Sequence, residues 1–478
     1  MFKKNNIGVY ALVFLFVILD IFFMSKGNYL LNTLPFVLII IYLAVFKLDT
    51  LLFLIIFLTP LSIPLRELVP NVSNDINLPT EPLLFGVLII VIFKAVYNKS
   101  FDRRIILHPI SIAIYINLLW IFITSLTSTM PVVSLKFTLS RIWFLATYFL
   151  LAAHLFHKKR NIYKYLWLYI SAYLVVIGYT LYRQSGYGFF DQKIANHLVS
   201  PLLPDHTSYA AIIAMLLPFM LISPRLFKSS KIALVSIYLT VLIFIVALVF
   251  SYTRAAWISL ALIAVMAVIM LLRIKFKIIF PLGLSILILL FSFQTEIKYM
   301  LEKNNQDSSD NFSEQIESVS NISTDASNLE RINRWNSAIR MFQEKPFLGF
   351  GPATYMFQYA PYQFSYDKTI ISTNAGDRGN AHSEYLGPLS EEGVLGLLTI
   401  LLVIGLTIYT ALNLYRKEQS HFVRLLSMLI LLGLTTYYIH GFLNDFLDLD
   451  KTSALFWGFT AIIVALDVYH SEPKELKK

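Results

Sequence analysis

Residues 232–250 read IALVSIYLTVLIFIVALVF and contain no charged side chain. A helix that crosses a lipid bilayer needs about 20 consecutive, mainly apolar residues. The apolar residues of this stretch are continuous, which excludes the strands of a membrane β-barrel, because their apolar residues recur at every second position. The stretch therefore predicts a transmembrane α-helix.

The composition of the whole chain agrees with this prediction. Of its 478 residues, 57% are hydrophobic and only 14% are charged, and the mean hydropathy is +0.66. Soluble domains carry about 25% charged residues, so the composition argues against a water-soluble globule. The chain contains no cysteine, which excludes disulfides, thiol catalysis and cysteine-ligated metals.

Apolar runs between charged or turn-forming breaks predict about 12 to 14 transmembrane helices. The runs are 7–24, 29–46, 50–65, 82–97, 109–127, 132–156, 164–182, 207–223, 232–250, 255–272, 278–294, 391–413, 425–443 and 454–470. The third run is the weakest, because Pro60 and Pro64 interrupt it. The expected fold class is an all-α polytopic membrane protein with about 14 transmembrane helices.

Lysine and arginine residues predict the orientation, because the cytoplasmic loops of membrane proteins are enriched in them. With the amino terminus in the cytoplasm, the predicted cytoplasmic loops carry clusters of positive charge at 99–104, 158–160, 225–231, 273–277 and 416–424. Both termini are therefore expected in the cytoplasm. The net charge of +10 is explained by this topology, and no nucleic-acid partner is expected.

The longest polar segment, 295–381, separates the eleventh and twelfth predicted helices and is expected on the periplasmic side. Its first half is rich in Asn, Asp and Ser at 304–328, which is typical of a weakly ordered chain. Its second half has four apolar residues at the spacing of an amphipathic helix: Ile332, Trp335, Ile339 and Phe342. We expect this large, partly helical loop to pack on the outer surface of the membrane domain.

Arg254 lies at the predicted outer edge of the membrane, in the sequence SYTRAAW. An arginine at that depth can simply extend its guanidinium group to lipid headgroups. Alternatively, it forms an anion site, because a guanidinium group binds phosphate through two parallel hydrogen bonds. Lipid-linked substrates present phosphate at this depth, so the sequence leaves both interpretations open.

Arg331 and Arg334 open the amphipathic helix in the sequence ERINRW. One interpretation is a solvated helix face that is paired with Glu330. The helix dipole does not explain arginines in a first turn, because that end of a helix favours anions. A helix amino terminus and arginine side chains together attract a phosphate group, which is the second interpretation.

His382 lies in the sequence NAHSEYL, where the loop returns to the membrane domain. A lone histidine is more often structural than catalytic. Its unperturbed pKa of about 6.5 nevertheless makes it the natural general base at neutral pH. The sequence has no HExxH spacing, paired Asp-x-Asp carboxylates or cysteine pair, so neither a metal site nor another cofactor is expected.

These segments together resemble the shared region of the O-antigen ligase superfamily. The superfamily comprises O-antigen ligases, Wzy-type polysaccharide polymerases and bacterial protein O-oligosaccharyltransferases. The resemblance covers roughly residues 250–400. It rests on SYTRAA, on Arg331-xxx-Trp335-xx-Ala338, on Pro346-xx-Gly349-x-Gly351, on AHSxYL from Ala381, and on EGxxG from Glu392.

The resemblance implies a glycosyltransferase of the bacterial inner membrane that moves a glycan from undecaprenyl pyrophosphate to an acceptor hydroxyl. It implies that Arg254 and Arg331 bind the pyrophosphate, and Arg334 is added to them. It also implies that His382 activates the acceptor, with inversion at the sugar. Supporting residues from the same motifs are Glu384, Tyr385 and Trp335.

The chain is accordingly divided into helices 1–11 (1–294), the periplasmic loop with its catalytic segment (295–390), and helices 12–14 with a cytoplasmic tail (391–478). A ligase would use lipid A-core as acceptor, a polymerase another lipid-linked glycan, and an oligosaccharyltransferase a protein hydroxyl. From another class, a transporter or flippase of lipid-linked sugars also needs many helices. No internal repeat typical of transporters is found, and the clustered Arg and His residues favour catalysis.

Overall fold

The computed structural model describes residues 6–69, 76–98, 101–190, 192–226, 230–274, 326–369, 372–373, 379–418 and 420–471, and also residues 277, 281, 285 and 292. The chain divides into two compact units, Met1–Ile55 and Ile56–Lys478. The first unit contains α1 (Asn6–Ser25), a 3-10 turn at Leu30–Thr33, α2 (Leu34–Phe46) and most of α3 (Leu48–Leu58).

The second unit is a helical bundle. Before the large loop its helices are α4 (Leu65–Leu68), α5 (Thr80–Phe93), α6 (Arg103–Ile106), α7 (Pro109–Leu126), α8 (Pro131–Phe144), α9 (Ala152–Leu155), α10 (Lys159–Ser185), α11 (Gln192–Ala195), α12 (His206–Leu226), α13 (Lys231–Val249) and α14 (Arg254–Leu271). The later helices are α18 (Ala326–Glu344), α19 (Tyr355–Gln358), α20 (Leu386–Lys417), α21 (His421–His440) and α22 (Asp450–Ala465).

Short irregular elements complete the second unit. The π-helical segments Lys94–Asn98, Leu145–Leu151 and Leu466–His470 continue α5, α8 and α22, and 3-10 turns lie at Thr59–Leu61 and Ala360–Tyr362. The strands β1 (Ile63–Pro64) and β2 (Asn77–Leu78) pair antiparallel, with Ile63 opposite Leu78. The described residues are therefore mostly helical, with a single two-stranded sheet among them, which confirms the predicted all-α class.

Ten of the described helices are long and apolar enough to cross a membrane, and three shorter apolar helices precede them within residues 10–61. Together these thirteen helices coincide with every predicted run except 278–294, which lies outside the described residues apart from 281, 285 and 292. The polytopic class is thus confirmed, and the exact number of spans stays a prediction. Run 50–65 differs in its end, because the helix stops at Leu58 where Pro60 follows.

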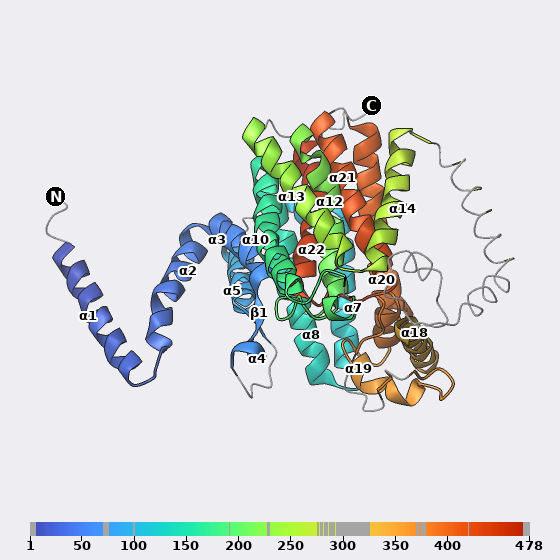
Figure 1. Ribbon diagram of the computed structural model, residues 1–478, viewed down its shortest axis with the longest axis horizontal. Helices are drawn as coiled ribbons and strands as arrows, with labels where there is room; N and C mark the ends of the chain where they lie inside the picture. Colours follow the sequence, from blue (N-terminus) through green and yellow to red (C-terminus); the bar gives the residue numbers. More distant parts are fainter. Residues whose placement is uncertain are drawn as a thin grey trace. The chain divides into compact units, whose positions relative to one another are not determined.

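The centre of the bundle consists of α12, α21 and α22 (Figure 1). Every residue of α22 is buried, as are most residues of α12 and α21. Tyr165 and Tyr169 of α10 donate hydrogen bonds to backbone oxygens of α22, at 2.6 and 2.9 Å. From Ala454 onward α22 is apolar on all sides except at Thr460, and such a helix is expected to be buried.

One end of the bundle is covered by α18 and α19 (Figure 1). The backbone N–H of Thr129, in the turn between α7 and α8, donates to the carbonyl of Phe350 at 2.9 Å. The hydroxyl of Ser134 donates to the carbonyl of Pro352 at 2.8 Å. These bonds join the described part of the large loop to the turn between α7 and α8. The lysine and arginine pattern predicts that this turn and the large loop lie on the same side of the membrane.

A break in α20 receives the chain that follows α18. Gly393 has a φ of 73° inside this helix, a conformation that favours glycine. A Cβ atom on Gly393 would collide with the backbone of Phe347, and the N–H of Val394 donates to the carbonyl of Pro346 at 2.9 Å. Residues 346–351 therefore lie against the kink of α20, which positions α18 over the start of that helix.

Candidate functional site

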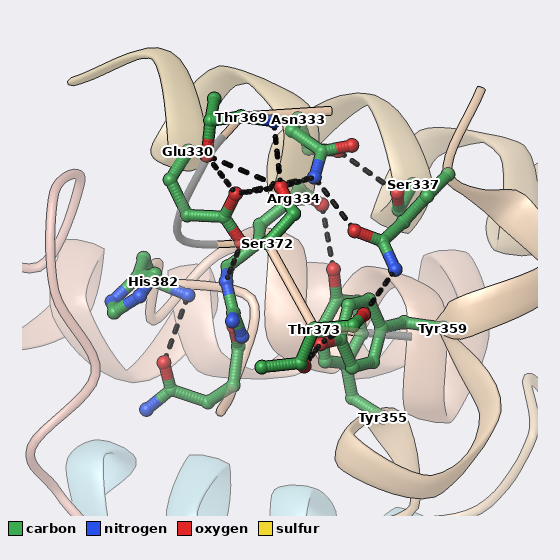
Figure 2. A network of polar contacts seen from close by, with 12 residues as sticks. Glu330, Asn333, Arg334, Ser337, Tyr355, Tyr359, Thr369, Ser372, Thr373 and His382 are labelled. Carbon is green, nitrogen blue, oxygen red and sulfur yellow. Dashed lines mark hydrogen bonds and ion pairs between the residues drawn. The ribbon is translucent and has the colours of Figure 1, made fainter. Parts of the chain in front are cut away.

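The first half of the buried face of α18 is polar, which differs from the predicted apolar stripe (Figure 2), whereas Ala338 and Met341 in its second half are buried in an apolar cluster. Asn333 is 0% and Arg334 6% exposed, whereas Ile339 of the predicted stripe is 40% exposed. Hydrogen bonds explain this orientation, because Asn333 Nδ2 donates to Gln363 Oε1 at 2.8 Å and to the hydroxyl of Ser372 at 3.1 Å. The helix is confirmed, and the predicted stripe is half-buried apart from Ile339, but the apolar pattern did not indicate the fully buried polar residues beside it.

Glu330 is the centre of this polar network. Its carboxylate accepts hydrogen bonds from the hydroxyls of Thr369 (2.9 Å) and Ser372 and from Nε of Arg334 (2.8 Å). Burial opposes ionisation, but these two hydroxyls and the Arg334 guanidinium group together lower the pKa of Glu330. Glu330 therefore carries a negative charge at neutral pH and fixes the position of Arg334.

Arg334 joins α18 to the segment that leads to His382. Its Nη1 donates to the carbonyl of Asn380 at 3.1 Å, and its guanidinium carbon lies 5.0 Å from the ring centre of Tyr359. Gly379, with a φ of +89°, lies so close that a Cβ atom would collide with the guanidinium group. These contacts give Arg334 a positioning role toward residues 379–382.

His382 lies in a strained turn beside these arginines. Its φ is 49°, its N–H donates to Asn380 Oδ1 at 3.0 Å, and its carbonyl accepts from Trp335 Nε1 at 3.4 Å. A bulky residue at positive φ is uncommon and is often found at functional sites. Burial, followed by the charges of Arg334 and Arg331, lowers the pKa of His382 to about 3. The imidazole is therefore neutral at neutral pH and able to accept a proton.

Arg331 connects α18 to the loop between α21 and α22. Its Nε donates to the carbonyl of Leu443 at 3.2 Å. Arg331 and Asp205, which precedes α12, both interact electrostatically with three histidines: His206, His382 and His440. Segments far apart in the sequence thus meet here, and we name the group the arginine–histidine cluster: Arg331, Arg334, His206, His382 and His440.

Two imidazole nitrogens of the cluster have unused hydrogen-bonding capacity. Nδ1 of His206 and Nε2 of His440 are buried, and neither has a hydrogen-bond partner among the described residues. Nδ2 of Asn444 lies 2.9 Å from Nδ1 of His440 and can only donate. A neutral His440 must therefore carry its proton on Nε2, which is available to an acceptor such as a phosphate oxygen.

Arg254 is the first residue of α14 and is half-buried. The preceding residue, Thr253, donates its hydroxyl to the carbonyl of His206 at 3.2 Å. This bond joins the start of α14 to the start of α12, which belongs to the arginine–histidine cluster. The structure therefore places Arg254 and Arg331 at the same end of the bundle.

The predicted supporting residues hold the walls of the site. Glu384 accepts hydrogen bonds from the N–H groups of Phe446 and Leu447, both at 2.8 Å, and from the hydroxyl of Tyr437. Tyr385 donates its hydroxyl to the carbonyl of Tyr438 at 2.8 Å. With the bond from Trp335 to His382, these contacts fasten the segment that carries the histidine to α18 and α21.

Sequence reasoning missed Asp205, His206, His440 and Asn444. Each lies at or next to an end of a central helix, and none belongs to a recognisable motif. Only their position at the outer ends of predicted spans, next to predicted non-cytoplasmic loops, could have indicated them. Their approach to Arg331 depends on how α12, α18 and α21 pack, which the sequence pattern does not specify.

Residues 239–401 match the family model described as O-antigen ligase. This region contains Arg254, Arg331 and His382, and it agrees with the region in which the motifs resemble that superfamily. The match confirms the predicted resemblance to the O-antigen ligase superfamily over this region, and it indicates a membrane enzyme of ligase or polymerase type that acts on lipid-linked glycans and their acceptors. No curated protein sequence matches the chain.

Proposed function

We propose that this protein transfers a glycan from undecaprenyl pyrophosphate to an acceptor hydroxyl, as a lipid A-core ligase or a polysaccharide polymerase. One observation carries the proposal: an uncharged, proton-accepting histidine lies beside arginines at the end of a membrane-spanning bundle. A lipid-linked pyrophosphate donor needs this combination, because its anionic group stays near the membrane surface while its sugar reacts above it.

The donor's pyrophosphate is proposed to bind Arg331 and Arg254. Nε2–H of His440 adds a hydrogen-bond donor to the same site. Arginine binds phosphate through a planar fork of N–H groups, and such charge-assisted hydrogen bonds are about twice as strong as neutral ones. Arg334, which is held by Glu330, contributes its charge and positions residues 379–382.

In the proposed reaction, His382 takes the proton of the acceptor hydroxyl as its oxygen attacks the anomeric carbon. The bond between that carbon and the phosphate oxygen breaks on the opposite side, so the configuration inverts. The leaving undecaprenyl pyrophosphate gains negative charge, which the guanidinium groups stabilise. The proton stays on His382, and no metal ion is required in this scheme.

Donor binding also solves the problem of a weakly basic histidine. The positive charges of Arg334 and Arg331 contribute to the low pKa of His382. A bound pyrophosphate opposes these charges, so it raises the pKa of the histidine and makes it a stronger base. His382 then becomes an effective base only when the donor is present.

A turnover assay tests the proposal. Purified full-length protein is mixed with an undecaprenyl-pyrophosphate glycan and candidate acceptors, without nucleotide. Glycan transfer with release of undecaprenyl pyrophosphate is expected. A transporter or flippase would move the lipid-linked sugar without releasing the pyrophosphate, and this outcome would exclude the proposed enzyme.

The proposed location is the bacterial inner membrane, with both termini in the cytoplasm and residues 295–381 in the periplasm. The chain contains no cysteine, so single cysteines can report topology. Ser309→Cys is expected to react with an impermeant thiol reagent in intact cells, and Ser471→Cys only after lysis. The reverse pattern would invert the topology.

A further inference from the structure

The chain that follows α18 exposes two apolar side chains in a turn that is fixed to α20. Phe347 is 71% and Leu348 39% exposed. The carbonyl of Pro346, directly before them, accepts a hydrogen bond from the N–H of Val394 at 2.9 Å. We name residues 346–348 the apolar turn. Its depth along the bundle decides whether water, lipid or another protein covers these side chains.

The helix α20 gives a first measure of this depth. Gly393 lies against the backbone of Phe347, and the basic residues Arg416 and Lys417 end the helix. At 1.5 Å per residue, about 35 Å of helix separate Gly393 from Arg416. The exposed residues between them are leucines, one glycine and one tyrosine. The hydrocarbon core of a bilayer is about 30 Å thick, so Gly393 lies at the boundary opposite to Arg416.

The helix α7 gives a second, independent measure. It contains 18 residues, so it is about 27 Å long and needs its whole length to cross the hydrocarbon core. The turn after α7 therefore lies at the membrane boundary. Thr129 of this turn bonds to the carbonyl of Phe350 through its N–H at 2.9 Å and through its hydroxyl at 2.8 Å. Both helices thus place the chain around residues 346–351 at the same membrane boundary. The exposed residues in the second half of α7 are all apolar: Leu119, Phe122, Ile123 and Leu126.

The sequence around the apolar turn changes in the way that a membrane surface requires. Gln343 and Glu344 at the end of α18 are exposed and polar. Lys345 follows and is half-buried, and the exposed Phe347 and Leu348 come next. Segments that lie in the interface of a bilayer combine basic residues with Phe and Leu in this way. The exposed side chains thus change from polar to apolar within a few residues.

We propose that the apolar turn inserts Phe347 and Leu348 into the lipid bilayer and anchors the end of α18 at the membrane surface. At this depth an apolar side chain leaves water by entering the acyl chains next to the headgroups. Lipid is favoured over a partner protein, because the turn lies level with lipid-facing residues of α7 and α20.

The anchor has a consequence for the arginine–histidine cluster. Arg331 and Arg334 lie on α18, and the apolar turn follows the end of the same helix. A helix is stiff over this length, so lipid contact at one end restrains the depth of the arginines at the other. The large loop is thereby attached to the bilayer as well as to α20 and the turn between α7 and α8.

Spin labels measure the depth directly, because the chain contains no cysteine. Full-length Phe347→Cys protein is labelled and placed in nanodiscs of phosphatidylethanolamine and phosphatidylglycerol. Collision rates with oxygen, which dissolves in lipid, and with a water-soluble nickel chelate are then measured. Leu242→Cys, at an exposed position of α13, is the lipid reference, and Gln343→Cys is the matched control in water. We expect the oxygen-to-nickel ratio at position 347 to exceed that at position 343 several-fold.

Two results would overturn the proposal. Equal ratios at positions 347 and 343 would place the apolar turn in water, and a label at position 347 that neither reagent reaches would show that protein covers it.

A lipid with a photoreactive diazirine on its acyl chain tests the unaltered protein. Adducts are expected on Phe347 or Leu348 and on the exposed residues of α13, and not on Gln343 or Glu344. Adducts on α13 without any on the apolar turn would contradict the proposal. Neither measurement needs a substrate, so its outcome is independent of the proposed glycosyl transfer.

Discussion

The arginine–histidine cluster and a carboxyl-lined cavity lie on two sides of the same segments but offer different polar groups. This carboxylate cavity is lined by Arg141 and by five acidic residues: Glu384, Glu391, Glu392, Asp445 and Asp448. The cluster joins α18 to the starts of α12 and α14 and the end of α21, and its charges belong mainly to arginines that make hydrogen bonds to backbone oxygens. The cavity joins α7, α8 and α20, and its carboxylates accept hydrogen bonds from backbone N–H groups. The cluster therefore offers guanidinium and imidazole groups, whereas the cavity offers mainly carboxyl groups.

The wall between the two regions consists of residues 379–385 and the loop 441–449. Asn380 Nδ2 donates to the carbonyl of Asp445 at 3.3 Å, and the N–H of Glu384 donates to the carbonyl of Gly441 at 2.8 Å. Arg331 and Glu384 also bond to this loop, one from each region. The comparison teaches that a short loop outside the family motifs separates a cluster of arginines and histidines from a cavity lined by carboxyl groups.

The largest expected effect is that of His382→Ala, which tests whether the base belongs to the cluster. We expect turnover to fall by about 10²–10⁴-fold, the usual contribution of a general base. Donor binding is expected to persist, because the histidine acts on the acceptor. His421→Ala, an exposed histidine at the start of α21, is the matched control. Full turnover in a folded His382→Ala protein would remove the proposed base.

Arg331→Ala tests whether the positive region binds the donor. Loss of a hydrogen bond to a charged group costs about 1.5–3 kcal/mol, so donor affinity is expected to fall about 10- to 100-fold. Arg331→Lys keeps the charge without the planar fork, so only partial recovery is expected. Donor binding is measured directly, with Arg103→Ala, at an exposed arginine, as the control. Unchanged donor affinity in Arg331→Ala would contradict the proposal that Arg331 binds the pyrophosphate.

Most of the fold could be predicted from the sequence, because a membrane span is a local property. A continuous apolar run such as 232–250 needs no partner to be recognised, and the structure places α13 there. The kink of α20 could not be predicted, because the EGxxG motif marks Gly393 but does not show that the backbone of Phe347 lies against it. The buried polar residues of α18 were missed for a related reason, since hydrogen bonds outweigh the apolar stripe.

The residues of the site also differ in whether they could be predicted from the sequence. His382, Arg254 and Arg331 stand in motifs and could be named as candidates from the sequence alone. The low pKa of His382 depends on burial and on two nearby arginines, so it could not be predicted from a sequence pattern. Arg141 and His440 lie outside the matched region 239–401, and only the packing of distant helices brings them to the site.

The pH dependence of turnover measures how strongly the positive region acts on its histidine. Because the pKa of His382 is about 3 without donor, its neutral form is present throughout pH 4–8 in the free protein. The acid limb of kcat/KM is therefore expected below pH 4, since this parameter reports the free enzyme. Bound pyrophosphate raises that pKa, so the acid limb of kcat is expected at higher pH. A shared acid limb near pH 6.5 would contradict the electrostatic argument.

The smallest expected effect comes from chelators, and it tests whether the carboxylate cavity holds a metal ion. The arginines are proposed to stabilise the leaving group, so the proposed reaction needs no divalent cation. Turnover and acceptor affinity are expected to stay within about twofold after EDTA treatment and dialysis, as measured on one preparation before and after. Loss of turnover that a single divalent ion restores would contradict this expectation. If Glu392→Gln then abolished the restoration, the carboxylate cavity would be a metal site, and the arginines of the cluster would not be sufficient to stabilise the leaving group.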